Sequence, residues 1–459
     1  MPGLFSAIDN MSAALQAFQQ ELSVTSNNVA NVNTPGYSRQ VAQLAEAPTS
    51  TYTAGAVMSI GNGVTVSSIN RIQDMFLQQR TQTAASDTGR LGTMSNGLTA
   101  VQGMLNEPGT SGISDALSSF FNAWSGLASN PSDSSQQLQV QTTAQTLTQR
   151  VQTLNQSLNA QATQETQTIG TTLQSIQATV NNIASLNQQI HLGSTSSSQP
   201  IALLDQRDQA LQQLSKLVDV QSQVNSDGTV NVSMNGLTLV DQTGAHQFPT
   251  TYSAANSTVT DVTGTSFPIR SGTLAGEFGL VNTIGAYKTQ LDTLANTVTS
   301  QVNTVYATAT DANGNTNQPF FNVTVPAGGA GSFALAPAIA ASSSAIATGV
   351  TGKAADSSVA LALSQLQNQS IAGLGGQTIQ GYYTNFVSGI GTQVSYYNSQ
   401  VTTQAAISTQ ISNQVQSISG VSLDDEMSHM LEYQRSYQAA AQSLSAFNST
   451  MDSLMNMIK

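Results

Sequence analysis

The side chains that most often perform chemistry in proteins are few and scattered in this chain. Its three histidines, His191, His246 and His429, lie far apart, and we find none with a second histidine or a carboxylate at metal-ligand spacing on a helix. Three consecutive acids, residues 424–426, carry the oxygen atoms that a divalent cation prefers. Attraction of acidic groups to the first turn of a helix explains them without any ligand. We therefore predict neither a metal nor another cofactor.

Other classes of active site are equally poorly supported. The chain has no cysteine, which excludes disulfides, thiolate ligands and cysteine nucleophiles. The glycine-rich stretches 61–63 and 373–376 lack the lysine and the strand-to-helix context of phosphate-binding loops, so we expect turns there. Without a convergent group of histidines or carboxylates, the sequence predicts a protein that is not an enzyme.

Composition also limits the possible partners. The net charge is −12, and only 12 of the 459 residues are lysine or arginine, which argues against binding to nucleic acid or to an anionic membrane. We find no apolar stretch of the roughly 18 to 20 residues needed to span a bilayer. The first positive side chain is Arg39, so no basic region of a cleavable signal peptide is present. These features predict a cytosolic protein, unless it leaves the cell by a route without a cleaved signal.

Both ends of the chain carry apolar residues at alternating spacings of three and four. The first series is Leu4, Ile8, Met11, Leu15, Phe18, Leu22, Thr25, Val29 and Val32. The second is Leu423, Met427, Met430, Gln434, Tyr437, Ala441, Leu444, Asn448, Met451, Met455 and Ile458. A strict 3.5-residue period predicts coiled-coil helices that pack against other helices. We expect the residues of these two series to form an assembly interface.

Each terminal stripe is too weak to order a helix alone. The entropy lost on ordering about 30 residues exceeds the gain from burying eight apolar side chains. Asp9 and Glu21 are the only charges of the first helix, so flanking salt bridges cannot compensate. We therefore expect the ends, including residues 5–30, to be frayed in the free monomer and to order when many copies pack together.

The pattern between the ends alternates helices with short strands. The first helix should end near Asn33, and a polar, irregular stretch follows to about Ile60. Residues 64–66 predict a strand, and residues 134–190 predict one long helix. A second helix over 200–217 is expected to return beside the long one.

A small β region interrupts the helices. The dipeptides Asp227-Gly228 and Asn235-Gly236 flank the alternating segment 229–234, which predicts tight hairpins. The expected fold is mainly α, with a discontinuous terminal coiled-coil domain, a helical-bundle middle domain and an inserted antiparallel β domain. The predicted domains are 1–66 with 402–459, then 67–217 with 273–401 including an irregular strand-containing part near 311–352, and the β insertion 218–272.

Two sequence strings resemble a known family. Residues 26–39, SNNVANVNTPGYSR, resemble the N-terminal signature of the axial proteins of the bacterial flagellum, and residues 423–427 and 433–441 resemble the C-terminal one. Residues 317–321 and 333–335 are similar to the middle of the first hook-associated protein family. The resemblance is strong over residues 1–75 and 420–459. It adds the signature residues Asn27, Asn28, Asn31, Thr34, Gly36 and Tyr37 to the expected assembly interface.

The resemblance implies a structural adaptor at the junction between hook and filament, needed for filament assembly. Such a protein is exported unfolded by the flagellar type III apparatus and assembles at the distal end of the hook, outside the cell. Its paired terminal helices form an inner tube around the export channel. The implied partners are further copies of the chain, the hook protein, the next junction protein (FlgL type) and an export chaperone (FlgN type) at the C-terminal helix.

Two other functions compete with this one. The first is another axial role, in the hook or the distal rod, and the second is a secreted enzyme with flagellar-like ends. Deletion separates the axial roles, because loss of a junction protein should leave complete hooks without filaments. The missing catalytic constellation disfavours the enzyme.

Overall fold

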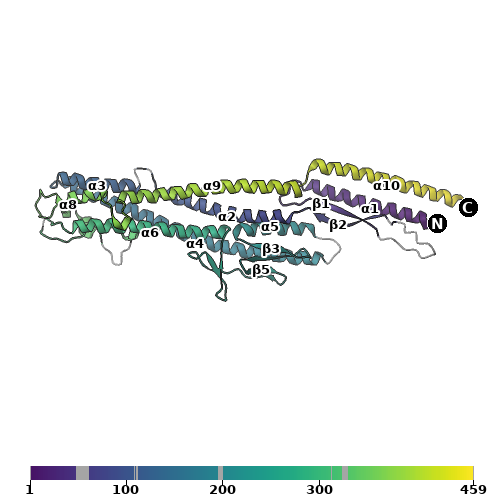
Figure 1. The fold of residues 1–459 in the computed structure, drawn as a ribbon, viewed down its shortest axis with the longest axis horizontal. Coiled ribbons are helices and arrows are strands. Elements are labelled where there is room, and N and C mark those ends of the chain that lie inside the picture. The colour runs from purple at the N-terminus through teal and green to yellow at the C-terminus, as the bar shows by residue number, and fades with distance from the viewer. Residues whose placement is uncertain are drawn as a thin grey trace. The chain divides into compact units, whose positions relative to one another are not determined.

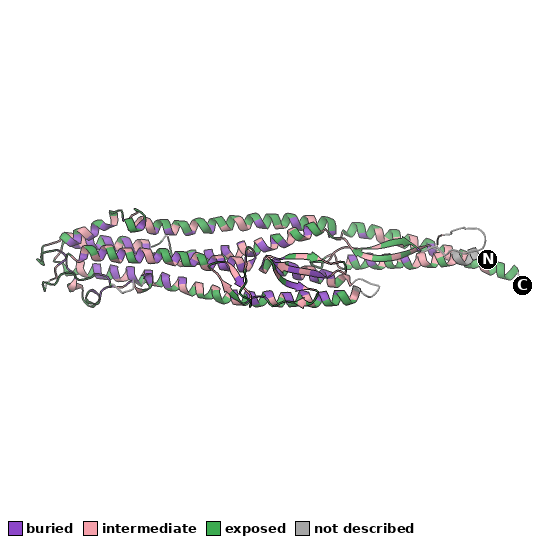
Figure 2. Cartoon of the chain, turned by 60° about the horizontal axis from the view of Figure 1, so that its bottom comes forward, coloured by how far each residue is buried: buried purple, intermediate pink, exposed green. Residues whose placement is uncertain are grey.

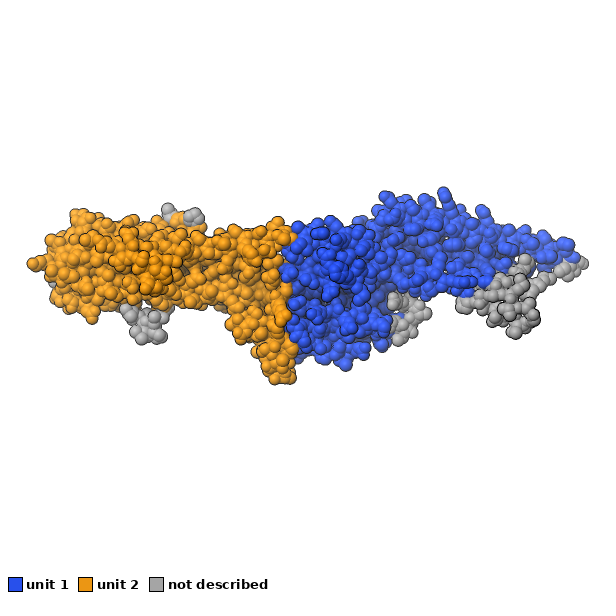
Figure 3. All heavy atoms as spheres, viewed as in Figure 1, with its two compact units in different colours: residues 1–87, 175–248, 404–459 blue, residues 88–174, 249–403 orange. Residues whose placement is uncertain are grey.

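The computed structural model describes residues 2–47, 61, 63–107, 109, 112–194, 200–311, 313–322 and 329–457, with the side chains of all of these except 2–6 and 194. Contacts divide the chain into two compact units (Figure 3). Unit 1 comprises residues 1–87, 175–248 and 404–459, and unit 2 comprises 88–174 and 249–403. The expected class, mainly α with antiparallel sheets inserted in the middle, is confirmed. The domain boundaries given above stay a prediction.

The two ends of the chain meet in unit 1. Helix α1 (Pro2–Ala30) lies beside α10 (Leu423–Met457), as Figure 1 shows. A two-stranded antiparallel ribbon, β1 (Gln40–Glu46) and β2 (Val64–Arg71), contacts α1. Strand β1 corrects the expectation of an irregular stretch up to Ile60. Five of its seven side chains are exposed, so no alternation of apolar and polar residues marks it as a strand.

The rest of unit 1 combines helix segments with a small sheet. The helices are the first part of α2 (Met75–Met104), the second part of α4 (Ser134–Ser194), α5 (Ile201–Leu217) and the end of α9 (Ile379–Ser419). The sheet has the order β3 (Gln221–Val224), β4 (Val230–Met234), β5 (Leu237–Asp241), β6 (Gly244–Ala245). The predicted long helix and returning helix are confirmed.

Turn chemistry sets the hairpins of this sheet. Asn235 and Gly236 connect β4 to β5 with φ values of +46° and +95°, the left-handed conformations of a two-residue hairpin loop. Side chains along β4 alternate between buried and half-buried positions, as the sequence pattern predicted. The paired Asp-Gly and Asn-Gly signals therefore located this sheet correctly.

Unit 2 holds a large apolar core. Its elements are the remaining parts of α2, α4 and α9, with α3 (Ile113–Ser129), α6 (Thr273–Tyr306), α7 (Pro337–Ala341), α8 (Ser358–Gln365) and four short 3₁₀ turns at 329–332, 343–345, 366–368 and 372–374. A three-stranded antiparallel sheet, β7 (Thr251–Ser253), β8 (Thr258–Thr260) and β9 (Ser266–Pro268), also belongs to it.

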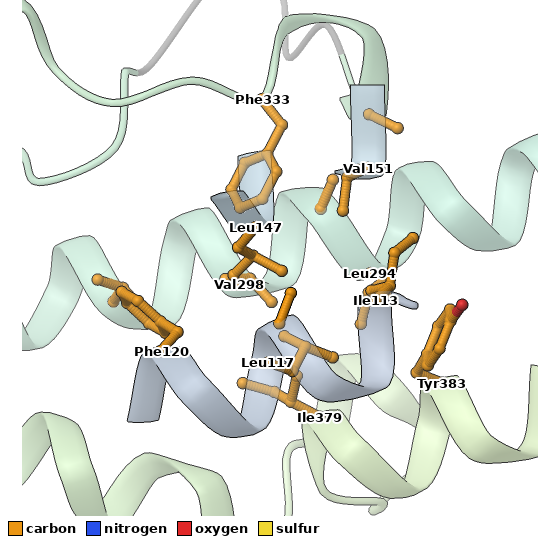
Figure 4. Close-up of a cluster of buried hydrophobic side chains, with 14 of the residues drawn as sticks. Ile113, Leu117, Phe120, Leu147, Val151, Leu294, Val298, Phe333, Ile379 and Tyr383 are labelled. Carbon is orange, nitrogen blue, oxygen red and sulfur yellow. The ribbon is translucent and has the colours of Figure 1, made fainter. Parts of the chain in front are cut away.

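Side chains from four helices interlock at the centre of the core of unit 2 (Figure 4), where buried residues are dense in Figure 2. The residues labelled in Figure 4 are Ile113, Leu117, Phe120, Leu147, Val151, Leu294, Val298, Phe333, Ile379 and Tyr383. Hydrophobic burial of this extent is the main stabilising contribution to unit 2. None of the helices in the described ranges is long and apolar enough to cross a membrane.

A buried carboxylate makes unit 2 sensitive to pH. Glu277 is 1% exposed; its Oε1 accepts a hydrogen bond from Thr172 Oγ1 at 2.7 Å, and its Oε2 has no partner within the described residues. Burial, opposed by this hydrogen bond and reinforced by the charge of Glu165, raises the pKa of Glu277 to about 7.

Because the pKa is higher in the folded state, the contribution of Glu277 to stability is complete below pH 4.5 and is lost as the pH rises to about 7. We expect the isosteric Glu277→Gln variant to be more stable than the parent at pH 8, by up to about 3 kcal/mol, with little difference at pH 4. Thermal unfolding between pH 4 and 8 measures this. The exposed Glu432→Gln should follow the parent curve, and equal slopes for Glu277→Gln and the parent would refute the assignment.

Candidate functional site

Four polar side chains join the two ends of the chain, and we call them the terminal latch: Asn28, Tyr37, Arg39 and Glu426. Asn28 on α1 donates from Nδ2 to Glu426 Oε2 on α10 at 3.0 Å. Arg39 Nε donates to Glu426 Oε1 at 2.7 Å. Both Asn28 and Glu426 are buried, with 1% and 2% of their surface exposed. Residues almost four hundred positions apart in sequence are therefore held in one buried hydrogen-bonded group.

Asn28 uses its whole side-chain amide in the latch. Besides Glu426, its Nδ2 donates to the carbonyl of Gln40 at 2.8 Å, and its Oδ1 accepts from the Gln40 N–H at 3.0 Å. Tyr37 OH also donates to Asn28 Oδ1, at 2.8 Å. The amide thus pairs with the backbone at the start of β1 as a neighbouring strand would, so Asn28 fixes the ribbon as well as α10.

The latch also fixes the link between α9 and α10. The backbone N–H of Arg39 donates to the carbonyl of Ser419, the last residue of α9, at 2.9 Å. Ser422 Oγ accepts from the Asp425 N–H at 3.4 Å and so caps the first turn of α10. Burial, with the charges of Asp205 and Glu426, raises the pKa of Tyr37 to about 12, so its hydroxyl stays a hydrogen-bond donor at neutral pH.

The remaining signature residues form the turn after α1. Asn31 Nδ2 donates to the Asn27 carbonyl at 3.0 Å and to Asn27 Oδ1 at 2.9 Å, and Thr34 Oγ1 donates to Asn31 Oδ1 at 3.1 Å. Gly36 then reverses the chain with a φ of +79°. Gln209 on α5 donates to the carbonyl of Pro35 at 2.6 Å. The signature string therefore encodes a helix end, a turn and a latch in one segment.

Gly36 is the position in this turn where a side chain should be least tolerated. A Cβ there would lie 2.1 Å from Gln209 Nε2, and its φ lies in the left-handed region. We expect Gly36→Ala to lower the free energy of unfolding of unit 1 by about 1 to 2 kcal/mol. Urea unfolding measures the loss. In a Gln209→Ala background the clash disappears and only the backbone strain should persist; a neutral Gly36→Ala would refute the strained turn.

A second buried network holds the ribbon on α5. Arg71 Nη1 at the end of β2 contacts Asp205 Oδ1 at 2.6 Å and Asp208 Oδ2 at 3.0 Å. Arg207, 1% exposed, pairs with Asp208 at 2.6 Å and donates to the carbonyl of Gly228. Burial raises the pKa of Asp205, although its hydrogen bonds and ion pair with Arg71 lower it. The network was not predicted, because its partners are more than 130 residues apart.

The two networks meet in three consecutive residues. Tyr37 reaches Asn28, Ser38 hydrogen-bonds Asp205, and Arg39 reaches Glu426. A single turn thus connects the terminal helix pair to the remainder of unit 1. Each of these three residues therefore makes a structural contact with a different part of unit 1.

The buried residues of α1 lie one position before the predicted stripe. Ala17, Glu21, Val24 and Asn28 are buried, with Thr25 of the predicted series beside them. The other predicted positions that the structure describes are half-buried: Ile8, Met11, Leu15, Phe18, Leu22, Val29 and Val32. One residue is a rotation of about 100° on a helix, so the apolar stripe flanks this buried line and stays partly open.

The predicted stripe of α10 is more exposed. Met430, Leu444 and Met451 are half-buried, whereas Leu423, Met427, Tyr437 and Met455 are exposed, with 38% to 65% of their surface accessible. The side chain of Leu4 and all of Ile458 lie outside the described residues. The fold therefore brings some of the predicted interface residues together within one chain and leaves the others open to solvent.

Glu21 is an exception within the α1–α10 contact. It is 7% exposed, and its Oε2 has no hydrogen-bond partner among the described side chains and backbone. Burial first, and the charge of Glu432 second, raise its pKa, while His429 lowers it. A buried carboxylate oxygen without a hydrogen-bond partner weakens the pair, which agrees with helices that need further contacts to become stable.

The histidines have more carboxylate neighbours than the sequence suggested. His191 Nδ1 lies 3.0 Å from Asp227 Oδ2, and His246 Nε2 lies 2.8 Å from Asp241 Oδ2. His429 has Glu432 one turn away at 3.7 Å, which corrects the statement that no histidine has a carboxylate at helical spacing. Across the described residues, no group of three or more such side chains could hold a metal ion.

Comparisons with known proteins agree with this architecture. Residues 8–37 match the family of flagella basal body rod proteins, and residues 412–457 match the C-terminal family of flagellar basal body rod FlgEFG proteins. These two segments contain Asn28, Tyr37 and Glu426 of the terminal latch, and Arg39 follows two residues after the first segment. A chain whose two ends carry these segments and pair through α1 and α10 is an axial protein of the bacterial flagellum.

The middle of the chain identifies the family. Residues 98–321 match the flagellar hook-associated protein FlgK helical domain. Flagellar hook-associated protein 1 of Escherichia coli K12 is 27% identical over 98% of this chain and 100% of its own, and that of Bacillus subtilis 168 is 28% identical over 99% of each. The chain belongs to the flagellar hook-associated protein 1 family, as the resemblance indicated.

A solved structure supports the same fold. The flagellar hook junction protein FlgK from Burkholderia pseudomallei matches with a TM-score of 0.65 at 19% identity. The match covers 74% of this chain and all of that one. At this identity the likeness shows the fold alone, and it agrees with the mainly helical class predicted from periodicity.

Proposed function

We propose that this chain is a structural adaptor at the junction between the flagellar hook and filament. Membership of the hook-associated protein 1 family supports the location. The single structural observation that carries the mechanism is the terminal latch, which folds the first and last helices of one chain into a pair. The chain would act by occupying a position and transmitting force.

The half-open apolar stripes give the pair its function in assembly. Leu15, Phe18 and Leu22 flank the buried line of α1 and keep part of their surface accessible. Burying such side chains against neighbouring copies contributes about 1.5 to 3 kcal/mol for each fully buried residue. In this proposal the latch aligns α1 with α10, and copies of the pair then pack around the axis of the flagellum through these stripes.

The remaining parts of the proposal follow from the family resemblance. The chain would leave the cell unfolded through the flagellar type III apparatus, and would lie outside the cell at the distal end of the hook. Its partners would be the hook protein, the next junction protein (FlgL type) and, before export, a chaperone (FlgN type) on α10. It would have no catalytic activity.

A second axial role deserves a test, because residues 8–37 and 412–457 match rod-protein families. Deleting the gene distinguishes the two roles. If the chain is the junction protein, cells should carry complete hooks without filaments and should release flagellin into the medium. Absence of the hooks themselves would contradict the junction role and favour a rod or hook component. Restoring the gene on a plasmid controls for effects on neighbouring genes.

Amide hydrogen exchange should reveal how assembly orders the ends. In the free monomer we expect fast exchange in residues 5–20, with protection increasing toward the latch residue Asn28, because α1 is anchored at that end. In isolated flagella the same amides should exchange far more slowly. Strong protection throughout residues 5–30 of the monomer would contradict assembly-dependent ordering.

A further inference from the structure

The face of α10 that points away from α1 carries a short series of complementary groups. With about 100° of rotation per residue, Asp424, Leu431 and Arg435 fall within about 20° of one line along the helix. Glu426 and Ala440, the two buried residues of α10, lie on the opposite side. All three residues of the line are exposed, and Leu431 keeps 55% of its surface accessible.

Arg435 is the single arginine or lysine of α1 and α10. Together α1 and α10 contain seven carboxylates: Asp9, Glu21, Asp424, Asp425, Glu426, Glu432 and Asp452. Glu426 is bound to Arg39, but neither Arg435 nor Asp424 has a side-chain partner within the described residues. Packing copies of such an acidic pair side by side brings like charges together, so a cation that stays unpaired in its own chain is available to offset the repulsion.

We propose that Arg435 forms an ion pair with Asp424 of a second copy of this chain, and that the pair sets the axial stagger of adjacent α10 helices. The inference rests on the proposed assembly of this chain. We consider an assembly whose copies all point the same way, so that neighbouring α10 helices are parallel. A displacement of eleven residues along the helix axis, about 16 Å, then places Asp424 of the neighbouring copy beside Arg435. Leu431 on the same line then becomes covered, which removes an exposed apolar side chain from water.

Engineered cysteines test the proximity directly, since the chain has no cysteine of its own. In one chain the two sites are about 16 Å apart along the helix, well beyond the roughly 7 Å between Cα atoms that a disulfide allows. Mild oxidation of flagella that carry Asp424→Cys with Arg435→Cys should therefore yield covalent dimers and higher multimers. The control Asp425→Cys with Ser436→Cys has the same spacing on another face and should give none.

Charge exchange tests the ion pair itself. Arg435→Asp should reduce the number of filaments per cell about tenfold, because it places acids opposite each other. Combining it with Asp424→Arg should restore the filaments. The amount of each variant found in the medium shows whether the variant is still exported. Two results would overturn the ion pair and leave the adaptor role intact. The first is that the double-cysteine chain is present at the junction but forms no cross-links, and the second is that Arg435→Asp cells carry a normal number of filaments. Absence of the parent chain from the junction would overturn both.

Discussion

Arg39→Ala is expected to cost about 3 to 5 kcal/mol of the stability of the joint between the terminal helices and the rest of unit 1. The substitution removes the guanidinium that lies 2.7 Å from Glu426 Oε1 and leaves a carboxylate that is 2% exposed with Asn28 as its remaining side-chain partner. Amide exchange around residues 28–40 and 419–426 measures the loss. Filament number should fall in parallel, because the misaligned pair cannot assemble.

Two variants show whether the loss comes from the unpaired buried charge. Replacing both members, Arg39→Met with Glu426→Met, should recover most of the stability, since no buried charge is then left alone. Arg435→Ala removes an exposed arginine that has no partner among the described residues and should leave the same amides unchanged. A loss below about 1 kcal/mol for Arg39→Ala would place the pair among weak surface salt bridges and would contradict its role as a latch.

Phe320→Ala is expected to destabilise unit 2 by about 3 to 5 kcal/mol. Phe320 is fully buried, and its ring centroid lies 5.3 Å from that of Trp124 and 5.3 Å from that of Tyr306. Removing the ring opens a cavity between aromatic side chains that cannot collapse easily. Urea unfolding, followed by the fluorescence of Trp124, the single tryptophan of the chain, measures the effect.

A matched substitution at the surface controls for the loss of a phenyl ring. Phe76 has 66% of its surface exposed, so Phe76→Ala should cost less than about 1 kcal/mol, including its contact with Arg80. If Phe320→Ala also cost less than about 1 kcal/mol, the aromatic cluster would contribute little to the stability of unit 2.

Local patterns predicted most elements of the fold. The apolar period of α4 and the Asp-Gly and Asn-Gly turns around β4 are short-range signals, and the structure confirms both elements. Strand β1 was missed because its side chains mostly face solvent. Its strand conformation is stabilised mainly by backbone pairing with β2. Elements that are defined by a distant partner leave little trace in their own composition.

The candidate site shows the same difference between local sequence signals and contacts with distant residues. Asn28 was identified through its place in a signature string. Glu426 was explained by the helix dipole, a local cause that gives no indication of its hydrogen bond with Asn28, 398 residues away. The buried line of α1 was missed by one position because it includes Glu21 and Asn28, whose polarity a search for apolar periodicity rejects. Only the packing of α10 against α1 reveals that these two residues face inward.

An electron cryomicroscopy map of the intact hook–filament junction would test the proposed role most directly. We predict density for this chain between hook and filament, with each α1–α10 pair near the axis and the stripe of Leu15, Phe18 and Leu22 packed against a neighbouring copy. Location of the chain in the rod or along the hook, or terminal helices whose stripes face solvent in the assembled state, would contradict the proposal.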